Sequence, residues 1–155
     1  MLPVKRLVSA GPHLMRRYGR IFVSLALLLY GLIRIGVGSL LFGQEVGWLN
    51  LPAFQGPIED IGGFLDRSAD KQIVPVSVAG YLGYIALMGL VLAVGAIGSL
   101  RNRSFGLTFI GLFLVMYALL FINFQTINPK ILHLAACAIL FGLLLWLNRT
   151  HRGTA

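Results

Sequence analysis

Residues 21–42 read IFVSLALLLYGLIRIGVGSLLF, and this stretch decides the fold of the chain. It contains a single charged residue, Arg34, inside an otherwise uncharged run. As a helix it would be ~33 Å long, close to the ~30 Å hydrocarbon core of a bilayer. A cleaved secretory signal would have a shorter apolar core, of about 7–15 residues, followed by a small-residue cleavage site. We therefore predict a retained membrane span.

The composition of the whole chain supports this interpretation. Of its 155 residues, 57% are hydrophobic and only 12% charged, whereas soluble domains carry about 25% charged residues. The net charge of +8 does not indicate nucleic-acid binding, because the basic residues flank apolar runs instead of forming a basic face. The single cysteine, Cys137, excludes an internal disulfide and a cysteine metal cluster. We expect the lipid bilayer to be the main partner, and no nucleic acid.

The rest of the chain continues the membrane pattern. Three further apolar runs follow, at residues 78–97, 105–122 and 131–147. The short polar connections between them force neighbouring helices to run antiparallel. The predicted fold class is all-α, an integral membrane four-helix bundle that forms a single domain over residues 21–147. Ser77, Ser104 and the Asn128-Pro129 pair are the predicted N-terminal ends of the last three helices.

Residues 43–77 form an acidic loop between the first two spans. The loop holds all five Asp and Glu residues of the protein. Four apolar residues share one helical face at i, i+4, i+7 and i+11 spacing, namely Phe54, Ile58, Ile61 and Leu65. With Pro57 at the first helical position, and Glu59 and Asp60 in the first turn, they predict a short amphipathic helix packed over the outer end of the bundle. This loop is also the predicted contact surface for a membrane or extracytoplasmic protein partner.

Basic residues near the ends of the spans predict the orientation of the chain. Nine Lys and Arg lie on one side, in residues 1–20, 98–104 and 148–155, against three on the other side. The positive-inside rule then places both termini in the cytoplasm, in a multi-pass protein of the plasma (inner) membrane. Residues 1–20 read as a basic amphipathic segment broken at Gly11-Pro12, which either lies on the membrane surface or only sets the orientation. Residues 148–155 form a basic cytoplasmic tail.

Arg34 is the main candidate site residue. Its Cα lies ~12 Å below the outer end of the predicted span. Snorkelling to that surface is the simplest explanation, but a helical Cα–Cβ bond tilts toward the N-terminus, here away from the nearer surface. An unpaired guanidinium in lipid costs about 2.5–3.5 kcal/mol. The predicted partners are loop carboxylates, exposed carbonyls, the hydroxyl of Tyr30 or Tyr84, or an anionic ligand, and both a structural and a functional role remain open.

His133 and Cys137 lie one turn apart near the start of the fourth span. Two ligands do not make a metal site, and the spacing also suits an interfacial histidine above a core cysteine. The alternative is a quinone headgroup that accepts a hydrogen bond from His133. The candidate cofactor-binding residues are therefore Arg34, Tyr84 and His133, with no catalytic residue and no metal ligand.

Several chemistries are disfavoured by what the sequence lacks. It has no histidine pair for a transmembrane haem, no phosphate-binding loop and no nucleotide fingerprint. The spans hold no paired carboxylates and no inverted repeat of the kind that transporters use. These absences favour a protein with no intrinsic cofactor and no catalytic activity of its own.

The layout resembles the DoxX-like family of small four-span membrane proteins. The resemblance rests on YGLIRIG (residues 30–36), the glycine-rich AGYLGYIALMGLVLAVGAIG (79–98) and the basic turn SLRNRS (99–104). Where many family members carry a glutamate early in the second span, this chain has Tyr84. The resemblance implies an accessory subunit of a membrane redox complex, linked to quinone. Two other hypotheses stay open, a noncatalytic membrane scaffold or assembly protein, and a small-solute or lipid-binding protein that uses a cavity near Arg34.

Overall fold

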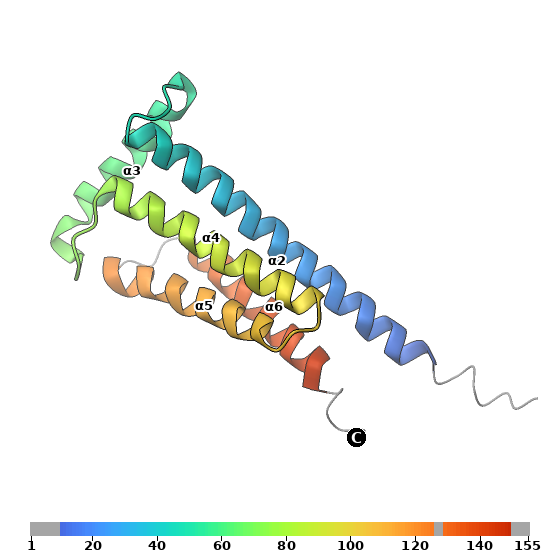
Figure 1. Ribbon diagram of the computed structural model, residues 1–155. Helices are drawn as coiled ribbons and strands as arrows, with labels where there is room; N and C mark the ends of the chain where they lie inside the picture. The colour runs from blue at the N-terminus through green and yellow to red at the C-terminus, as the bar shows by residue number, and fades with distance from the viewer. Residues whose placement is uncertain (1–9, 126–128, 150–155) are drawn as a thin grey trace, which may run out of the picture.

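The computed structural model describes residues 10–125 and 129–149, and all regular secondary structure in this part of the chain is helical (Figure 1). Four helices are long and apolar enough to cross a membrane, namely α2 (Ala10–Glu45), α4 (Val78–Leu100), α5 (Phe105–Phe124) and α6 (Ile131–Arg149). Between α2 and α4 lie the amphipathic helix α3 (Gln55–Arg67) and two short 3-10 turns, Pro52–Phe54 and Ala69–Lys71. The predicted all-α membrane bundle, with its extra amphipathic helix, is confirmed.

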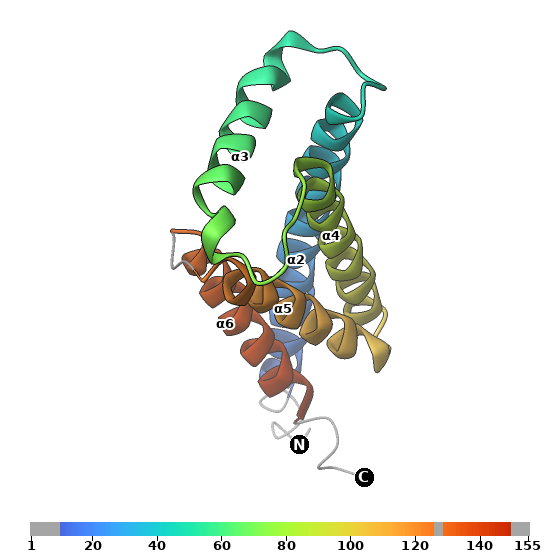
Figure 2. The same ribbon diagram turned by 90° about the vertical axis from the view of Figure 1, so that its left-hand side faces the viewer.

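The four long helices form a closed ring. α2 packs along α4, α4 along α5, α5 along α6, and α6 returns to α2. Figure 1 shows α2 and α4 lying side by side in opposite directions. α3 lies at the end of the bundle where α4 begins and α5 ends (Figure 1), and Figure 2 shows that end turned toward the viewer. There α3 contributes Leu65 to a small apolar cluster with Tyr81 and Phe124, so the loop helix is part of the packed structure at this end.

Small residues bring α2 and α4 into backbone contact. A Cβ atom placed on Gly89 would lie 2.8 Å from the carbonyl oxygen of Gly31 and 2.8 Å from the amide nitrogen of Ile35. Gly31 in turn faces Ala93 as well as Gly89. The small residues Gly89 and Ala93, one turn apart in the sequence, are thus the packing face of α4. Such close approach is the usual way membrane helices gain dispersion energy, since lipid supplies no hydrophobic drive between them.

The first helix is longer than the sequence predicts. It has 36 residues and is therefore ~54 Å long, well beyond the predicted run of 21–42. Gly11 and Pro12, where the sequence predicts a break, lie in the first turn of α2, and because residues 1–9 lie outside the described residues, the break itself stays a prediction. Proline is tolerated in the first turn, since its missing N–H would have no intrahelical partner anyway. The first part of the predicted basic surface segment, residues 1–9, and all but the start of the basic tail lie outside the described residues.

Two of the three predicted helix starts can be compared with the structure. Ser77 caps α4, because its hydroxyl oxygen accepts a hydrogen bond from the amide of Gly80 at 3.1 Å. Ser104 directly precedes α5, so the predicted helix start is correct, but it has helical backbone angles and makes no capping hydrogen bond. A cap needs an extended backbone to turn the side chain toward the first free N–H groups. Asn128 lies outside the described residues.

This difference predicts that Ser77→Ala should lower the free energy of unfolding by about 1 kcal/mol, while Ser104→Ala should change it little. Cys137, the one cysteine of the sequence, is 5% exposed and provides the measurement. Thermal unfolding in nonionic detergent can be followed by its reaction with a thiol-specific dye. Equal shifts of the two midpoints would contradict the assigned cap.

Candidate functional site

The Arg34 side chain is surrounded by aromatic rings inside the bundle. Its guanidinium carbon lies 4.7 Å from the ring centroid of Tyr117, 5.5 Å from that of Tyr30 and 5.7 Å from that of Phe113. Tyr30 precedes Arg34 by one turn of α2, and the other two rings lie one turn apart on α5. Each such contact is worth about 0.5–2 kcal/mol. Three aromatic faces therefore hold the cation within the bundle, and the predicted escape to the surface by snorkelling is not observed.

The hydrogen bonds of Arg34 leave much of its donor capacity unused. One terminal nitrogen, Nη1, donates to the hydroxyl of Tyr30 at 2.9 Å, and Nη2 contacts the sulfur of Met88 at 3.9 Å. Its Nε is buried without a hydrogen-bond partner. A guanidinium has five N–H donors and keeps its charge in proteins. Arg34 therefore presents a permanent cation with unfilled donors.

Of the partners that the sequence predicts for Arg34, the structure contains the hydroxyl of Tyr30. The hydroxyl of Tyr84 instead donates to the carbonyl oxygen of Met116 at 2.9 Å. All five acidic residues are among the described residues, and within that part of the chain no hydrogen bond joins Arg34 to a carboxylate. Among the described residues, the guanidinium instead contacts aromatic faces, the Tyr30 hydroxyl and the Met88 sulfur, all of them uncharged.

Beside Arg34 lies a cavity of about 240 Å³ to which all four long helices or their ends contribute. Its lining combines two cationic residues, an imidazole, three phenols and two aliphatic residues: Arg34, Lys130, His133, Tyr30, Tyr81, Tyr117, Ile85 and Leu120. No carboxylate belongs to this lining among the residues that the structure describes. We call this space the Arg34 cavity. Both of its charged residues, Arg34 and Lys130, are cations, which favours an anionic occupant.

Contacts at the rim order the cavity. Lys130 donates from Nζ to the hydroxyl of Tyr81 at 3.3 Å, and its Nζ lies 5.7 Å from the ring centroid of Phe64 on α3. The hydroxyl of Tyr117 donates to the backbone carbonyl of Lys130 at 3.3 Å. The His133 ring stacks on Tyr30, with centroids 6.4 Å apart and an interplanar angle of 11°. These contacts join the start of α6 to the other helices around Arg34.

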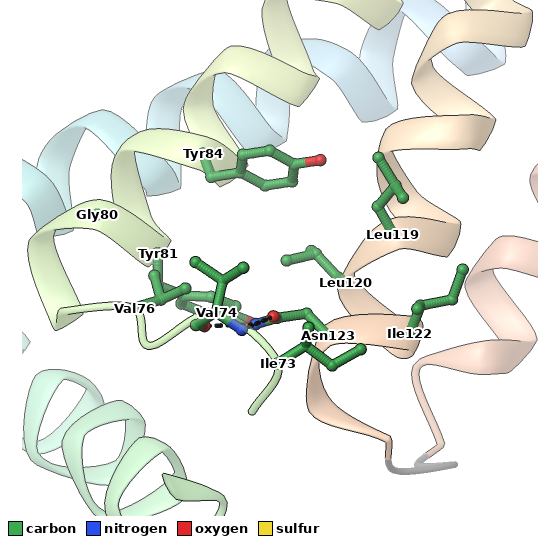
Figure 3. Close-up of a pocket in the computed structure, with 10 residues that line it drawn as sticks. All are labelled: Ile73, Val74, Val76, Gly80, Tyr81, Tyr84, Leu119, Leu120, Ile122 and Asn123. Atoms are coloured by element: carbon green, nitrogen blue, oxygen red, sulfur yellow. Dashed lines mark hydrogen bonds between the residues drawn. The ribbon is translucent and has the colours of Figure 1, made fainter. Parts of the chain in front are cut away.

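A second, more apolar pocket of about 330 Å³ lies between α4 and α5 (Figure 3). Tyr84 and Leu119 face each other across it, and residues 73–76 close one end. That segment is fixed to α5 by Asn123, whose side chain accepts from the amide of Val74 at 2.8 Å and donates to its carbonyl at 3.1 Å. The amide of Ile73 adds a bond to the carbonyl of Asn123 at 3.1 Å. We call this space the α4–α5 pocket.

The structure separates the three residues that the sequence singles out. Arg34 and His133 line the same cavity, whereas Tyr84 lines the α4–α5 pocket. Sequence reasoning missed Tyr117 and Lys130. A usable signal for Tyr117 existed, because Phe113 and Tyr117 lie one helical turn apart and so share a face of the third span. Lys130 carried no comparable signal, since a lysine beside a span is normally an interface anchor.

Comparisons with protein-family models, curated proteins and solved structures return no match. The DoxX-like resemblance therefore stays a prediction, and the fold and the site stand on the geometry described above.

Proposed function

We propose that this integral membrane protein is a ligand-binding protein, and that the Arg34 cavity binds a small anionic group. The observation that carries the proposal is the setting of Arg34, a permanent charge with a buried, unpartnered Nε beside a cavity that no described carboxylate lines. A charge inside a membrane protein is costly and usually marks a functional path or site. An anion in the cavity would supply a negative charge to a guanidinium that no carboxylate pairs among the described residues.

The chemistry of the lining favours an anion over a neutral acceptor. Arg34 and Lys130 both contribute positive charge, and charge-assisted hydrogen bonds are about twice as strong as neutral ones. A guanidinium also matches the two oxygens of a carboxylate or phosphate with parallel N–H donors. The volume of about 240 Å³ is below the ~300–1,000 Å³ of sites for drug-sized molecules. A carboxylate or phosphate monoester with little else attached is the ligand class that fits.

A second proposal is the accessory role in a membrane redox complex that the DoxX-like resemblance implies. Arg34 and His133 line one cavity, so two donors could reach the carbonyl oxygen of a quinone. Residues 43–77 would then supply the contact with the partner enzyme. Because a quinone is neutral, a binding experiment that compares a quinone with anions can distinguish this proposal from anion binding. The scaffold hypothesis, in turn, predicts no ligand at all.

In the predicted orientation, with both termini in the cytoplasm, the Arg34 cavity lies in the outer half of the membrane. It would then receive its ligand from the outer side or from the outer leaflet. The end of the bundle that carries α3 would face the cell exterior.

The test is ligand binding to the purified full chain in phosphatidylcholine nanodiscs, with empty nanodiscs as the blank. Saturation-transfer nuclear magnetic resonance can compare hexanoate and butyl phosphate with the neutral analogue hexanamide and with a short-chain quinone. We expect saturable binding of the two anions, at least tenfold tighter than that of hexanamide, a difference of about 1.4 kcal/mol.

The same titration decides between the proposals. Binding of the quinone but not of the anions would replace anion binding by the redox-linked role. Binding of no probe above the empty-disc signal would contradict both and favour a scaffold. Binding of inorganic phosphate as tightly as butyl phosphate would identify a free anion, not a headgroup, as the ligand.

A further inference from the structure

The Arg34 cavity and the α4–α5 pocket share part of their lining. Tyr81 and Leu120 belong to both. Tyr81 is 5% exposed and packs its ring against Phe124, and its hydroxyl faces Lys130 at the rim of the Arg34 cavity. One side of this wall is therefore cationic and rich in hydroxyls, and the other side is hydrocarbon. The two spaces adjoin at a boundary of two side chains.

The α4–α5 pocket is suited to an apolar occupant because its polar groups are already used. The Tyr84 hydroxyl is committed to the carbonyl of Met116, and the Asn123 amide is committed at both ends to Val74. The remaining lining is largely aliphatic. An occupant of this space would meet a tyrosine hydroxyl and an asparagine amide that are already hydrogen-bonded to the protein, and burying a polar group without a partner costs several kcal/mol in hydrocarbon.

The outer rim of this pocket faces the lipid. Four of its apolar side chains are at least half exposed in the isolated chain, namely Ile73, Val74, Leu119 and Ile122. Leu119 and Ile122 lie on a membrane-spanning helix, where exposed apolar side chains contact acyl chains. The pocket therefore opens sideways, between α4 and α5, toward the bilayer.

We propose that the two spaces form one site for a single-chain anionic amphiphile, such as a long-chain carboxylate or a monoacyl phosphate. Its anionic headgroup lies against Arg34, and its hydrocarbon chain passes Tyr81 and Leu120 into the α4–α5 pocket and on into the lipid. This inference rests on the proposed anion binding and adds the chemical class of the ligand and its route. The headgroup position follows from the positive charge of Arg34 and Lys130, and the chain position follows from the residues that the two linings share.

Photochemical labelling tests where the chain lies. The probe is hexadecanoate with a diazirine in the middle of the chain, added to the protein in phosphatidylcholine nanodiscs. After irradiation, peptide mass spectrometry locates the adducts. We expect them in residues 73–76 and 119–122, and we expect excess hexanoate to reduce them, because the short acid competes for the headgroup position only.

Leu119→Trp should fill the α4–α5 pocket and reduce labelling there about tenfold, equivalent to about 1.4 kcal/mol. Leu112→Trp is the matched control. Leu112 lies two turns earlier on α5 with a similar exposed fraction, 46% against 50%, and does not line the pocket. Hexanoate binding to both variants should equal that of the unmodified protein, which shows that the headgroup position and the fold are intact.

Three outcomes are decisive. Adducts confined to the two segments and lost in Leu119→Trp support the inference. Adducts spread over all lipid-facing helices, and insensitive to hexanoate, overturn the inference while leaving anion binding standing if hexanoate still binds. Failure of hexanoate itself to bind would overturn the proposed function and, with it, this extension.

Discussion

Replacing Arg34 with methionine should weaken hexanoate binding at least 100-fold. A hydrogen bond to a charged group contributes about 1.5–3 kcal/mol, and a bidentate carboxylate would lose two of them, whereas 100-fold corresponds to about 2.7 kcal/mol. The substitution also removes the positive charge held by Tyr30 and Tyr117. Methionine keeps the length and apolar bulk of the arginine stem, so the helices should still pack. The measurement is the same saturation-transfer titration in nanodiscs.

Two further variants separate a lost site from a lost fold. Arg34→Lys keeps the charge without the planar pair of donors, so it should bind more weakly than the parent but more tightly than Arg34→Met. Arg101→Met removes an exposed arginine just after α4, at the far end of that helix from the cavity, and should leave binding unchanged. All three should retain the helical circular dichroism of the parent. Full affinity in Arg34→Met would remove the basis of the proposed function.

The largest effect on stability should come from Gly106, where α5 crosses α4. A Cβ atom at this position would lie 2.7 Å from the carbonyl carbon of Gly98 and 2.9 Å from the carbonyl oxygen of Gly95. These are backbone atoms of α4, which cannot turn aside as a flexible side chain could. Overpacking of this kind typically costs about 1–3 kcal/mol, and occasionally more. Gly106→Ala should therefore lose about 3 kcal/mol, and Gly106→Val should not fold stably.

Gly142→Ala on α6 is the matched control, because an added Cβ there meets nothing within 4 Å. Alanine loses less backbone entropy than glycine when the helix folds, so this variant should be up to about 1 kcal/mol more stable. The dye reaction of Cys137 on heating measures both substitutions, and they should have opposite signs. A stable Gly106→Val protein would show that α4 and α5 do not approach as closely as described.

The fold was largely predictable because each span is a continuous apolar run with its own polar boundary. The four spans and the loop helix follow from hydropathy and from residues such as Leu65, which packs where the i+11 position of the loop helix predicts. The start of α2 was not predictable in the same way. Residues 10–20 are polar and include two glycines and a proline, yet α2 continues through them, so hydropathy marks the end of the lipid core and not the end of the helix.

The site was predictable only at its centre. Arg34 is conspicuous as a charge in an apolar run, and its own-helix partner Tyr30 follows from i, i+4 spacing. The contacts with Phe113 and Tyr117 depend on which face of α5 turns toward α2, and that is set by small-residue packing across three helices. Whether Tyr84 and His133 line one pocket or two also depends on how the helices are rotated about their axes. Sequence alone carries no information on helix rotation of that precision.

The most direct test of the central claim is to observe the Arg34 Nε–H itself. Nuclear magnetic resonance of protein with ¹⁵N-labelled arginine side chains, in nanodiscs, resolves the Nε–H signals, and Arg34→Met identifies the one that belongs to Arg34. We predict that hexanoate shifts this signal saturably while hexanamide does not, and that the exposed Arg101 signal stays in place. An Arg34 signal that is unchanged at saturating hexanoate, or one that moves equally with hexanamide, would contradict anion binding at this cavity.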